Sequence, residues 1–339
     1  MESAQARLAT LDPPRGPRIA SDVDPAMCAA LDRVAALLDE RCAGDGPFQQ
    51  IARHVFARPG KRIRARLTVA CAALRGIGNP PERDVIEAAA AVELFHQASL
   101  VHDDICDAAA ERRGAPSVVA AFGIRAAGLA GAFLAGHGLA LLGGLMARRH
   151  RRLDLARLES LVEGQILECV PRRPSAREAW SRYERVVAGK TGALFRFACE
   201  VGSMLVAFPA SICGAVDVFA GELALAFQML DDVRDLEGPP DLEKPVCKDL
   251  ACGVVTWPML HWVTTVADPA AALERAARVP KSAEEIVALR RLILDSGATV
   301  RARRFARERL AAARAALDEL PPGWGRANLE ALVVRVEQQ

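Results

Sequence analysis

The chain has 339 residues, 51% of them apolar, which is enough for one large globular domain or two ordinary ones. Its 44 basic and 42 acidic residues nearly cancel, so a net charge of +2 gives no reason to expect nucleic acid or an anionic membrane as a partner. Nine cysteines occur without a C-x-x-C pair or an apolar secretory segment, which favours reduced thiols in a cytoplasmic protein.

The sequence pattern is helical throughout. Residues 1–20 are rich in Pro and Arg, so we expect a loose N-terminal leader followed by one domain over 21–339. No run of alternating β-branched or aromatic residues appears, whereas Ala, Leu, Arg and Glu are abundant, and this predicts an all-α, single-domain helical bundle. Short segments rich in Pro and Gly, which interrupt helices, lie at 78–81, 171–174, 238–240 and 321–323. We expect helices to start near Asn79 and Ser175.

A dense group of charges lies in residues 99–114, SLVHDDICDAAAERRG, on a helix expected from about Asp84 to Ala109. Asp103 and Asp107 are four positions apart and so lie roughly 40° apart on one helix face, where two carboxylates can bind one cation. A solvated helix end is the simpler explanation for one such cluster, since charged side chains are ordinarily exposed.

The segment 126–147 is long enough to cross a bilayer, and His137 is its only strongly polar residue. Ala and Gly dominate it where a membrane span would carry Leu, Ile and Phe, and no other segment resembles it. We therefore interpret it as a buried helix whose small residues let a neighbouring backbone or a ligand approach, and we expect no stable membrane span.

A second cluster in FQMLDDVRDLEG, residues 227–238, repeats the Asp-Asp-x-x-Asp spacing as Asp231, Asp232 and Asp235. Two identical clusters, each preceded by apolar residues, are hard to explain as solvated faces, because like charges this close repel unless a cation neutralises them. Carboxylate oxygens without His or Cys indicate a hard ion, and Mg²⁺ completes its shell with waters and substrate phosphate oxygens. The clusters therefore predict a diphosphate ligand.

Lysine usage points to the same chemistry. Only five of the 44 basic residues are Lys, and four of these lie in the short segments GKRIR (60–64), GKTG (189–192) and EKPVCKD (243–249). A compact ammonium binds a phosphate oxygen as a point charge, whereas Arg offers a planar fork. Chance is the alternative for so small a count. A nucleotide P-loop at GKTG is disfavoured, because the upstream Gly and a preceding strand are missing.

Five motifs together resemble the trans-isoprenyl (polyprenyl) diphosphate synthases in order and approximate spacing: GKRIR, HQASLVHDDICD with RRG, the segment from Tyr183 to Thr191, FQMLDDVRD, and EKPVCKDLACGVVTWP. They cover residues from about 45 to 265. The resemblance implies the isoprenoid synthase fold around a deep apolar cavity, usually as a homodimer, in which an allylic diphosphate ionises and isopentenyl diphosphate attacks the cation. It also implies Mg²⁺ as the cofactor, about three ions per site, and small-molecule diphosphates as the substrates.

The resemblance also implies roles for single residues, with Asp103, Asp107, Asp231 and Lys190 central to catalysis. The expected direct Mg²⁺ ligands are Asp103, Asp107 and Asp231, and those that bind metal-held waters or further ions are Asp104, Asp232 and Asp235. The expected contacts of the allylic diphosphate are Arg112, Lys190, Thr191, Gln228 and Lys244. Those of the isopentenyl diphosphate are Lys61, Arg64, His96 and Arg113. Taken singly, each residue is also explained as a surface charge or a core residue, but jointly they favour catalysis.

Three departures from the family pattern stand out, at Ala65, His137 and Val254. Val254 replaces the lysine of a Gly-Lys pair, so either Lys248 compensates or the allylic diphosphate binds more weakly. None of the departures removes a metal ligand.

Product length depends on the wall of the cavity below the first cluster. Ala98 and Ser99 are small where short-chain members carry an aromatic residue, so a growing chain can pass. Deeper obstruction is expected from Phe95, Phe133 or Leu134. We expect a product of about twenty carbons or more, by analogy with the family.

Two other functions remain open from the sequence. A class I terpene cyclase on the same fold needs the metal clusters but not the isopentenyl diphosphate contacts, which this chain retains. A non-catalytic partner subunit of a prenyl transferase generally loses aspartates, whereas this chain keeps all six.

Overall fold

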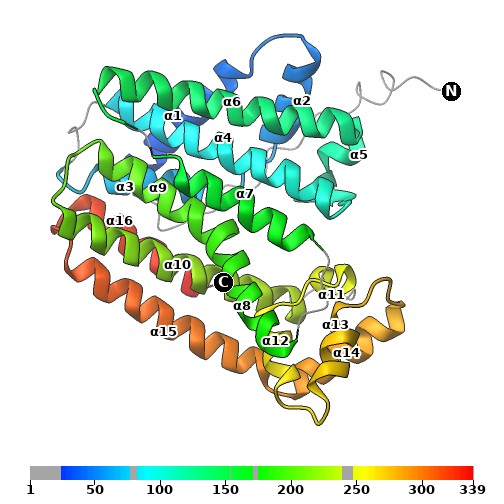
Figure 1. Cartoon of the computed structure of the whole chain (residues 1–339). Helices are drawn as coiled ribbons and strands as arrows, with labels where there is room; N and C mark the ends of the chain where they lie inside the picture. The colour runs from blue at the N-terminus through cyan, green and yellow to red at the C-terminus, as the bar shows by residue number, and fades with distance from the viewer. Residues whose placement is uncertain (1–23, 77–81, 153, 171–174, 239–246, 339) are drawn as a thin grey trace.

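The structure, a computed structural model, describes residues 24–76, 82–152, 154–170, 175–238 and 247–338, so the expected leader at 1–20 lies outside it. The described residues form an all-α fold, as predicted, apart from a short antiparallel pair of β1 (Glu111–Arg112) and β2 (Ala115–Pro116) (Figure 1). The helices before the second cluster are α1 (Pro25–Arg41), α2 (Pro47–Phe56), α3 (Ile63–Ala72), α4 (Glu82–Cys106), α5 (Val118–Phe122), α6 (Ile124–Arg148), α7 (Ala156–Cys169), α8 (Ala176–Val187), the π-helix η1 (Ala188–Gly192) and α9 (Ala193–Met204). Those that follow are α10 (Ala210–Glu237), α11 (Lys248–Cys252), α12 (Trp257–Val263), α13 (Pro269–Ala277), α14 (Ala283–Asp295), α15 (Ala298–Asp318) and α16 (Trp324–Glu337).

The long helices α4 and α10 form the framework of the bundle. α4 packs along α6 and α3, and α10 packs along α15 and α9 (Figure 1). Between them lies one large apolar core that includes the fully buried rings of Phe195, Phe197 and Phe219. A second, smaller core lies under α12, α13 and α14. Full burial of each such ring contributes roughly 1.5–3 kcal/mol, so packing of these rings holds α9 and α10 against the core.

Local signals explain where some helices begin and end. At the start of α8, the Ser175 hydroxyl accepts from the Glu178 N–H, and the Glu178 carboxylate accepts from the Ser175 N–H over 2.8 Å. This capping box confirms the predicted start at Ser175. The start expected near Asn79 lies outside the described residues. The helix expected over 84–109 begins at Glu82 and ends at Cys106, because the chain turns there into the β1–β2 hairpin.

Among the described residues, two helices, α6 and α10, are long and apolar enough to cross a bilayer on length and composition alone, so the expectation that no other segment resembles 126–147 was wrong in this respect. This is weak evidence for a membrane, because core helices pass the same test. α6 packs against α4, and α10 against α15, so both have extensive protein partners.

Candidate active site

The two aspartate clusters lie at the C-terminal ends of the two framework helices, α4 and α10. Asp107 lies just beyond α4, but its N–H still donates to the Asp103 carbonyl over 2.9 Å, so the helical spacing continues. The C-terminal end of a helix carries partial negative charge, which makes it unfavourable for carboxylates. The clusters therefore need cations close by.

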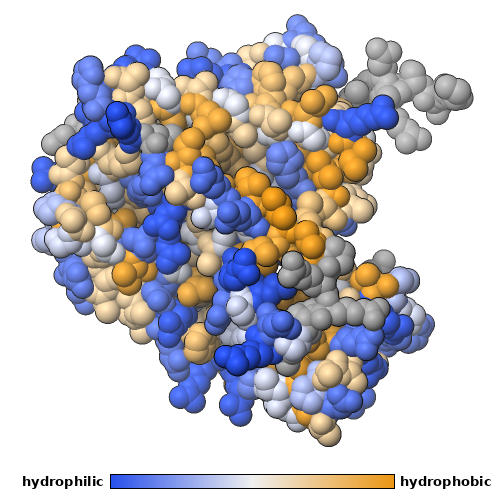
Figure 2. Space-filling view, in the orientation of Figure 1, coloured by the Kyte–Doolittle hydropathy of each residue, from blue (hydrophilic) through white to orange (hydrophobic). Residues whose placement is uncertain are grey.

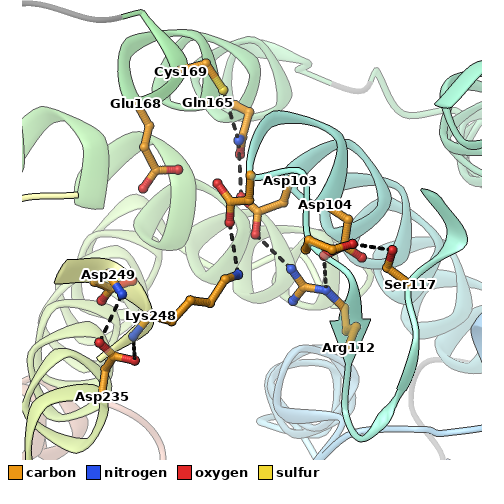
Figure 3. A network of polar contacts seen from close by, with 12 residues as sticks. Asp103, Asp104, Arg112, Ser117, Gln165, Glu168, Cys169, Asp235, Lys248 and Asp249 are labelled. Atoms are coloured by element: carbon orange, nitrogen blue, oxygen red, sulfur yellow. Dashed lines mark hydrogen bonds and ion pairs between the residues drawn. The ribbon is translucent and has the colours of Figure 1, made fainter. Parts of the chain in front are cut away.

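Cationic side chains hold the first cluster. Arg112, on β1, donates through Nε to Asp104 Oδ1 over 2.7 Å and through Nη2 to Asp103 Oδ2 over 3.0 Å (Figure 3). Lys190 Nζ lies 2.5 Å from Asp103 Oδ1, and Gln165 donates to the same oxygen over 3.2 Å. Burial raises the pKa of Asp103, but the charge and hydrogen bond of Lys190 outweigh it and lower the pKa overall. For Asp104 burial dominates, and the pKa is raised.

Lys190 reaches Asp103 because its backbone packs directly on α7. It lies in the π-helix η1, and such π-helical turns are frequent at functional sites. A Cβ on Gly164 would lie 2.6 Å from the Lys190 nitrogen, and one on Gly189 would lie 2.8 Å from the Gly164 Cα, so this contact requires glycine on both sides. The same contact brings Glu168, on α7, into an ion pair with Lys190.

Asp232, in the second cluster, belongs to a buried network. Its carboxylate accepts from the Tyr183 hydroxyl over 2.7 Å, from Gln228 Nε2 over 2.8 Å and from the Trp257 backbone over 3.4 Å. Gln228 in turn accepts from the Thr191 hydroxyl over 2.7 Å. Burial raises the pKa of Asp232 to about 6 against these bonds. The network therefore joins the predicted contact Thr191, on η1, to the predicted contact Gln228, on α10.

The other two carboxylates of the second cluster face different surroundings. Asp231 is exposed, with Lys61 among the positive charges near it. Asp235 accepts from the backbone N–H groups of Lys248 over 3.0 Å and Asp249 over 3.1 Å (Figure 3). These bonds attach the start of α11 to α10. The predicted contact Lys244 lies outside the described residues.

The residues predicted to bind isopentenyl diphosphate are brought together only in part. Arg64 Nη1 lies 3.2 Å from His96 Nε2, and the guanidinium lies over the Phe195 ring, 5.1 Å from its centroid. Burial lowers the pKa of His96 well below its usual value, and the charges of Arg64 and Arg113 lower it further. Among the described residues, the buried atoms Arg64 Nε and His96 Nδ1 have no hydrogen-bond partner. Unpaired buried donors are costly, so this pocket suits an anionic ligand or bound water.

The residues predicted to set product length lie on α4 and differ in burial. Ser99, one turn before Asp103 on the same face, is half-buried. Ala98 is buried. Phe95 packs edge-to-face on Phe197 of α9, with 5.8 Å between the ring centroids. Ser99 is therefore the member of this group closest in orientation to the aspartates.

The interpretation of Phe133 as an inner obstruction was wrong. Its side chain is 45% exposed on the outside of α6, where its ring contacts Phe48 and His137. Hydrophobicity alone does not distinguish the two faces of a helix as uniformly apolar as α6. Leu134, the next residue, is buried.

Three side chains with a carboxamide or carboxylate group lie at the site but were not predicted from the sequence: Gln165, Glu168 and Asp249. Asp249 lies within EKPVCKD, and its burial beside the second cluster raises its pKa strongly, so the motif itself was a usable signal. Gln165 and Glu168 have no such signal, because only the packing of α7 brings Glu168 to Lys190 and Gln165 to Asp103.

The donor set suits Mg²⁺. In the described part of the chain, no three Asp, Glu, His or Cys side chains converge as a complete metal centre. Mg²⁺ does not need one, because it commonly takes one or two carboxylates and fills its remaining positions with waters and phosphate oxygens. The groups available at the ends of α4 and α10 are carboxylates, the hard ligands that this ion prefers.

Comparison with known proteins gives a consistent result. A family model described as polyprenyl synthetase matches residues 46–293. The geranylgeranyl diphosphate synthase of Mycobacterium tuberculosis is 34% identical over 271 residues, which cover 77% of this chain and 75% of that protein. The nonaprenyl diphosphate synthase of the same organism is 32% identical over 315 residues, which cover 91% of this chain and 92% of that protein.

The fold has close counterparts among solved structures. A polyprenyl synthase from Caulobacter crescentus, complexed with calcium and isoprenyl diphosphate, superposes with a TM-score of 0.82 at 28% identity. The match covers 95% of this chain and 99% of that one. Similarity therefore extends well beyond the motifs to the arrangement of nearly the whole chain.

Proposed function

The chain belongs to the polyprenyl synthetase family, and we propose that it condenses isopentenyl diphosphate with an allylic diphosphate between the ends of α4 and α10. The product is an all-trans polyprenyl diphosphate. One observation carries the assignment of the site: three cationic side chains, those of Arg112, Lys190 and Lys248, bond to the first carboxylate cluster, and the backbone of Lys248 also donates to Asp235 of the second. This arrangement matches a ligand that combines a divalent cation with a diphosphate.

The first chemical step is departure of the allylic diphosphate. Asp103, Asp107 and Asp231 would hold Mg²⁺, about three ions per site by the family pattern, with Asp104, Asp232 and Asp235 in support. Bound Mg²⁺ supplies Lewis-acid neutralisation of the leaving diphosphate. Arg112 and Lys190 add fixed positive charge where negative charge develops, and Thr191 and Gln228 are positioned beside them. No side-chain nucleophile is required.

The second substrate must keep its diphosphate while its double bond reacts. Arg64, His96 and Arg113 form a second group of positively charged or neutral donors, in which His96 lies against Arg64, and Lys61 is nearer to Asp231. The unpaired Arg64 Nε and His96 Nδ1 are available to phosphate oxygens. A neutral His96 keeps one ring N–H as a donor.

The product contains about twenty carbons or more, in line with the small Ala98 and Ser99 below the first cluster. The relatives described above are both synthases, which supports this function over a terpene cyclase or a non-catalytic subunit.

The working unit in this proposal is a cytoplasmic homodimer. Apolar residues gather over α6 and α7 on the face shown in Figure 2. Several are well exposed, including Leu129 at 74%, Val162 at 58% and Ile166 at 55%. Apolar exposure of this extent is typical of an interaction surface.

The proposed function is tested by incubating the protein with Mg²⁺, isopentenyl diphosphate and geranyl or farnesyl diphosphate, and sizing the products. We expect consumption of isopentenyl diphosphate and formation of a longer allylic diphosphate. Release of a hydrocarbon without consumption of isopentenyl diphosphate would overturn the proposal.

A further inference from the structure

Lys248 connects the two aspartate clusters. Its backbone N–H donates to Asp235 Oδ1 over 3.0 Å, and its ammonium lies 3.1 Å from Asp107 Oδ2. Of the hydrogen bonds among the described residues, those of Lys248 are the ones that reach both clusters. We propose that Lys248 binds the allylic diphosphate directly, in place of the lysine that the family carries at Val254; this inference rests on the proposed function.

The backbone of Lys248 is anchored independently of its side chain. Asp235 accepts from two successive N–H groups, those of Lys248 and Asp249, and this fixes the start of α11 against α10. The ammonium then extends toward the end of α4. Because its stem is flexible, the ammonium can move from Asp107 to an oxygen bound beside it without a change in the main chain.

The ammonium of Lys248 is also more available than the other cations at the site. Its side chain is 47% exposed, whereas those of Arg112 and Lys190 are each 27% exposed. Arg112 is shared between two carboxylates, and Lys190 is shared between Asp103 and Glu168. Lys248 pairs through its side chain with Asp107, which leaves two of its three ammonium donors for another acceptor.

Val254 itself offers no charge to a diphosphate. Its backbone N–H donates to the Asp249 carbonyl over 2.9 Å, at the end of the same short helix that Lys248 begins. In this chain the positive charge of Lys248, at the start of α11, therefore takes the place of the lysine that the family carries just after the end of this helix. The segment keeps a cation at the site although the usual position has lost it.

The test measures binding and kinetics of Lys248→Met and Lys248→Gln, with Lys248→Arg as the conservative variant. Calorimetric titration with inorganic pyrophosphate in the presence of Mg²⁺ reports affinity without turnover. We expect Kd to rise about tenfold to a hundredfold in the Met and Gln variants, the usual effect of losing a charge-assisted hydrogen bond, and far less in the Arg variant. In steady-state assays KM for the allylic substrate should rise, while KM for isopentenyl diphosphate stays within about twofold.

Lys281→Met is the matched control. Lys281 Nζ donates to the Leu250 carbonyl of α11 over 2.7 Å, so this variant removes a lysine that supports the same helix but does not bond to either cluster in the described part of the chain. We expect its pyrophosphate affinity to stay within about twofold of the wild type. Melting curves for all variants identify any that fail to fold.

Unchanged pyrophosphate affinity in both the Met and Gln variants, or an equal rise in KM for both substrates, would overturn the inference. A loss of affinity in Lys281→Met as large as that in Lys248→Met would also overturn it, since placement of α11 would then explain the effect. Failure of the proposed function can be distinguished from failure of this inference. If the proposed function is wrong, the wild type makes no polyprenyl product, whatever affinity the variants have for pyrophosphate.

Discussion

Lys190 Nζ lies 2.5 Å from Oδ1 of Asp103, although 87 positions separate the two residues. The pair joins the end of α4 to the π-helix η1, and the contact of Gly164 with η1 makes it possible. Burial alone would raise the pKa of Asp103, and the charge of Lys190 reverses this. The two residues belong to different motifs but act as one electrostatic unit.

Replacing Lys190 by Met should lower kcat strongly. The variant removes a fixed positive charge from the place where the leaving diphosphate develops negative charge, and loss of one such group typically costs about a hundredfold or more. Single-turnover assays with saturating allylic substrate and isopentenyl diphosphate measure the effect. Arg304→Met, at an exposed position on α15, is the charge-matched control and should leave the rate unchanged. A rate near that of the wild type in Lys190→Met would contradict the assigned role.

Gly164→Ala should destabilise the protein and reduce activity. The new Cβ would lie 2.6 Å from the Lys190 backbone nitrogen, and neither backbone can yield without moving α7 or η1. We expect a loss of about 1–3 kcal/mol in the free energy of unfolding, measured by denaturant titration. Gly214→Ala is the matched control, because a Cβ at this position in α10 meets nothing within 4 Å. That variant should be stabilised by about 0.5–1 kcal/mol. Equal stability of the two variants would show that the α7–η1 contact is not tight.

Stability should fall as the pH drops below about 6.5, in part because of His96. Burial and the charge of Arg64 lower the pKa of His96 in the folded state, so between the folded and unfolded pKa values the unfolded chain binds more protons. The free energy of unfolding then decreases by up to about 1.4 kcal/mol per pH unit below 6.5. His96→Gln keeps an acceptor for Arg64 and removes this titration. Urea denaturation of both metal-free proteins at several pH values gives the slopes, and identical slopes would contradict the assignment.

The fold and the composition of the site follow largely from the sequence, whereas the contacts between motifs do not. The spacing of Asp103 and Asp107 determines their common face, because helix geometry is local. The burial of Asp232 and the exposure of Asp231 differ although the two are neighbours in the same motif. That difference depends on α8 and α12, which supply the partners Tyr183 and Trp257. The periodicity of apolar residues describes a single helix and does not show which other helices pack against it.

Ser99→Phe should shorten the product. Ser99 lies one turn before Asp103 on the face that carries the aspartates, so an aromatic ring there would occupy space beneath the bound allylic group. Chromatographic sizing of the products from farnesyl diphosphate measures the shift. Ser99→Ala is the control and should leave the length distribution unchanged. If Ser99→Phe is folded and active with the same products, the limiting wall lies elsewhere.

Leu129→Glu should convert the proposed homodimer into a monomer. Leu129 is 74% exposed on α6, within an outer face that also carries the partly exposed Phe133 and Leu139. A buried carboxylate without a partner is costly, so a charge at the centre of an apolar interface should weaken association strongly. Val300→Glu is the matched control, because Val300 is 70% exposed on α15, away from that face. Sedimentation velocity over a range of concentrations measures the mass of each variant. The wild type and Val300→Glu should sediment as dimers, and Leu129→Glu should sediment as a monomer. If all three proteins are dimers, the interface lies on another surface. A monomeric wild type would refute the homodimer.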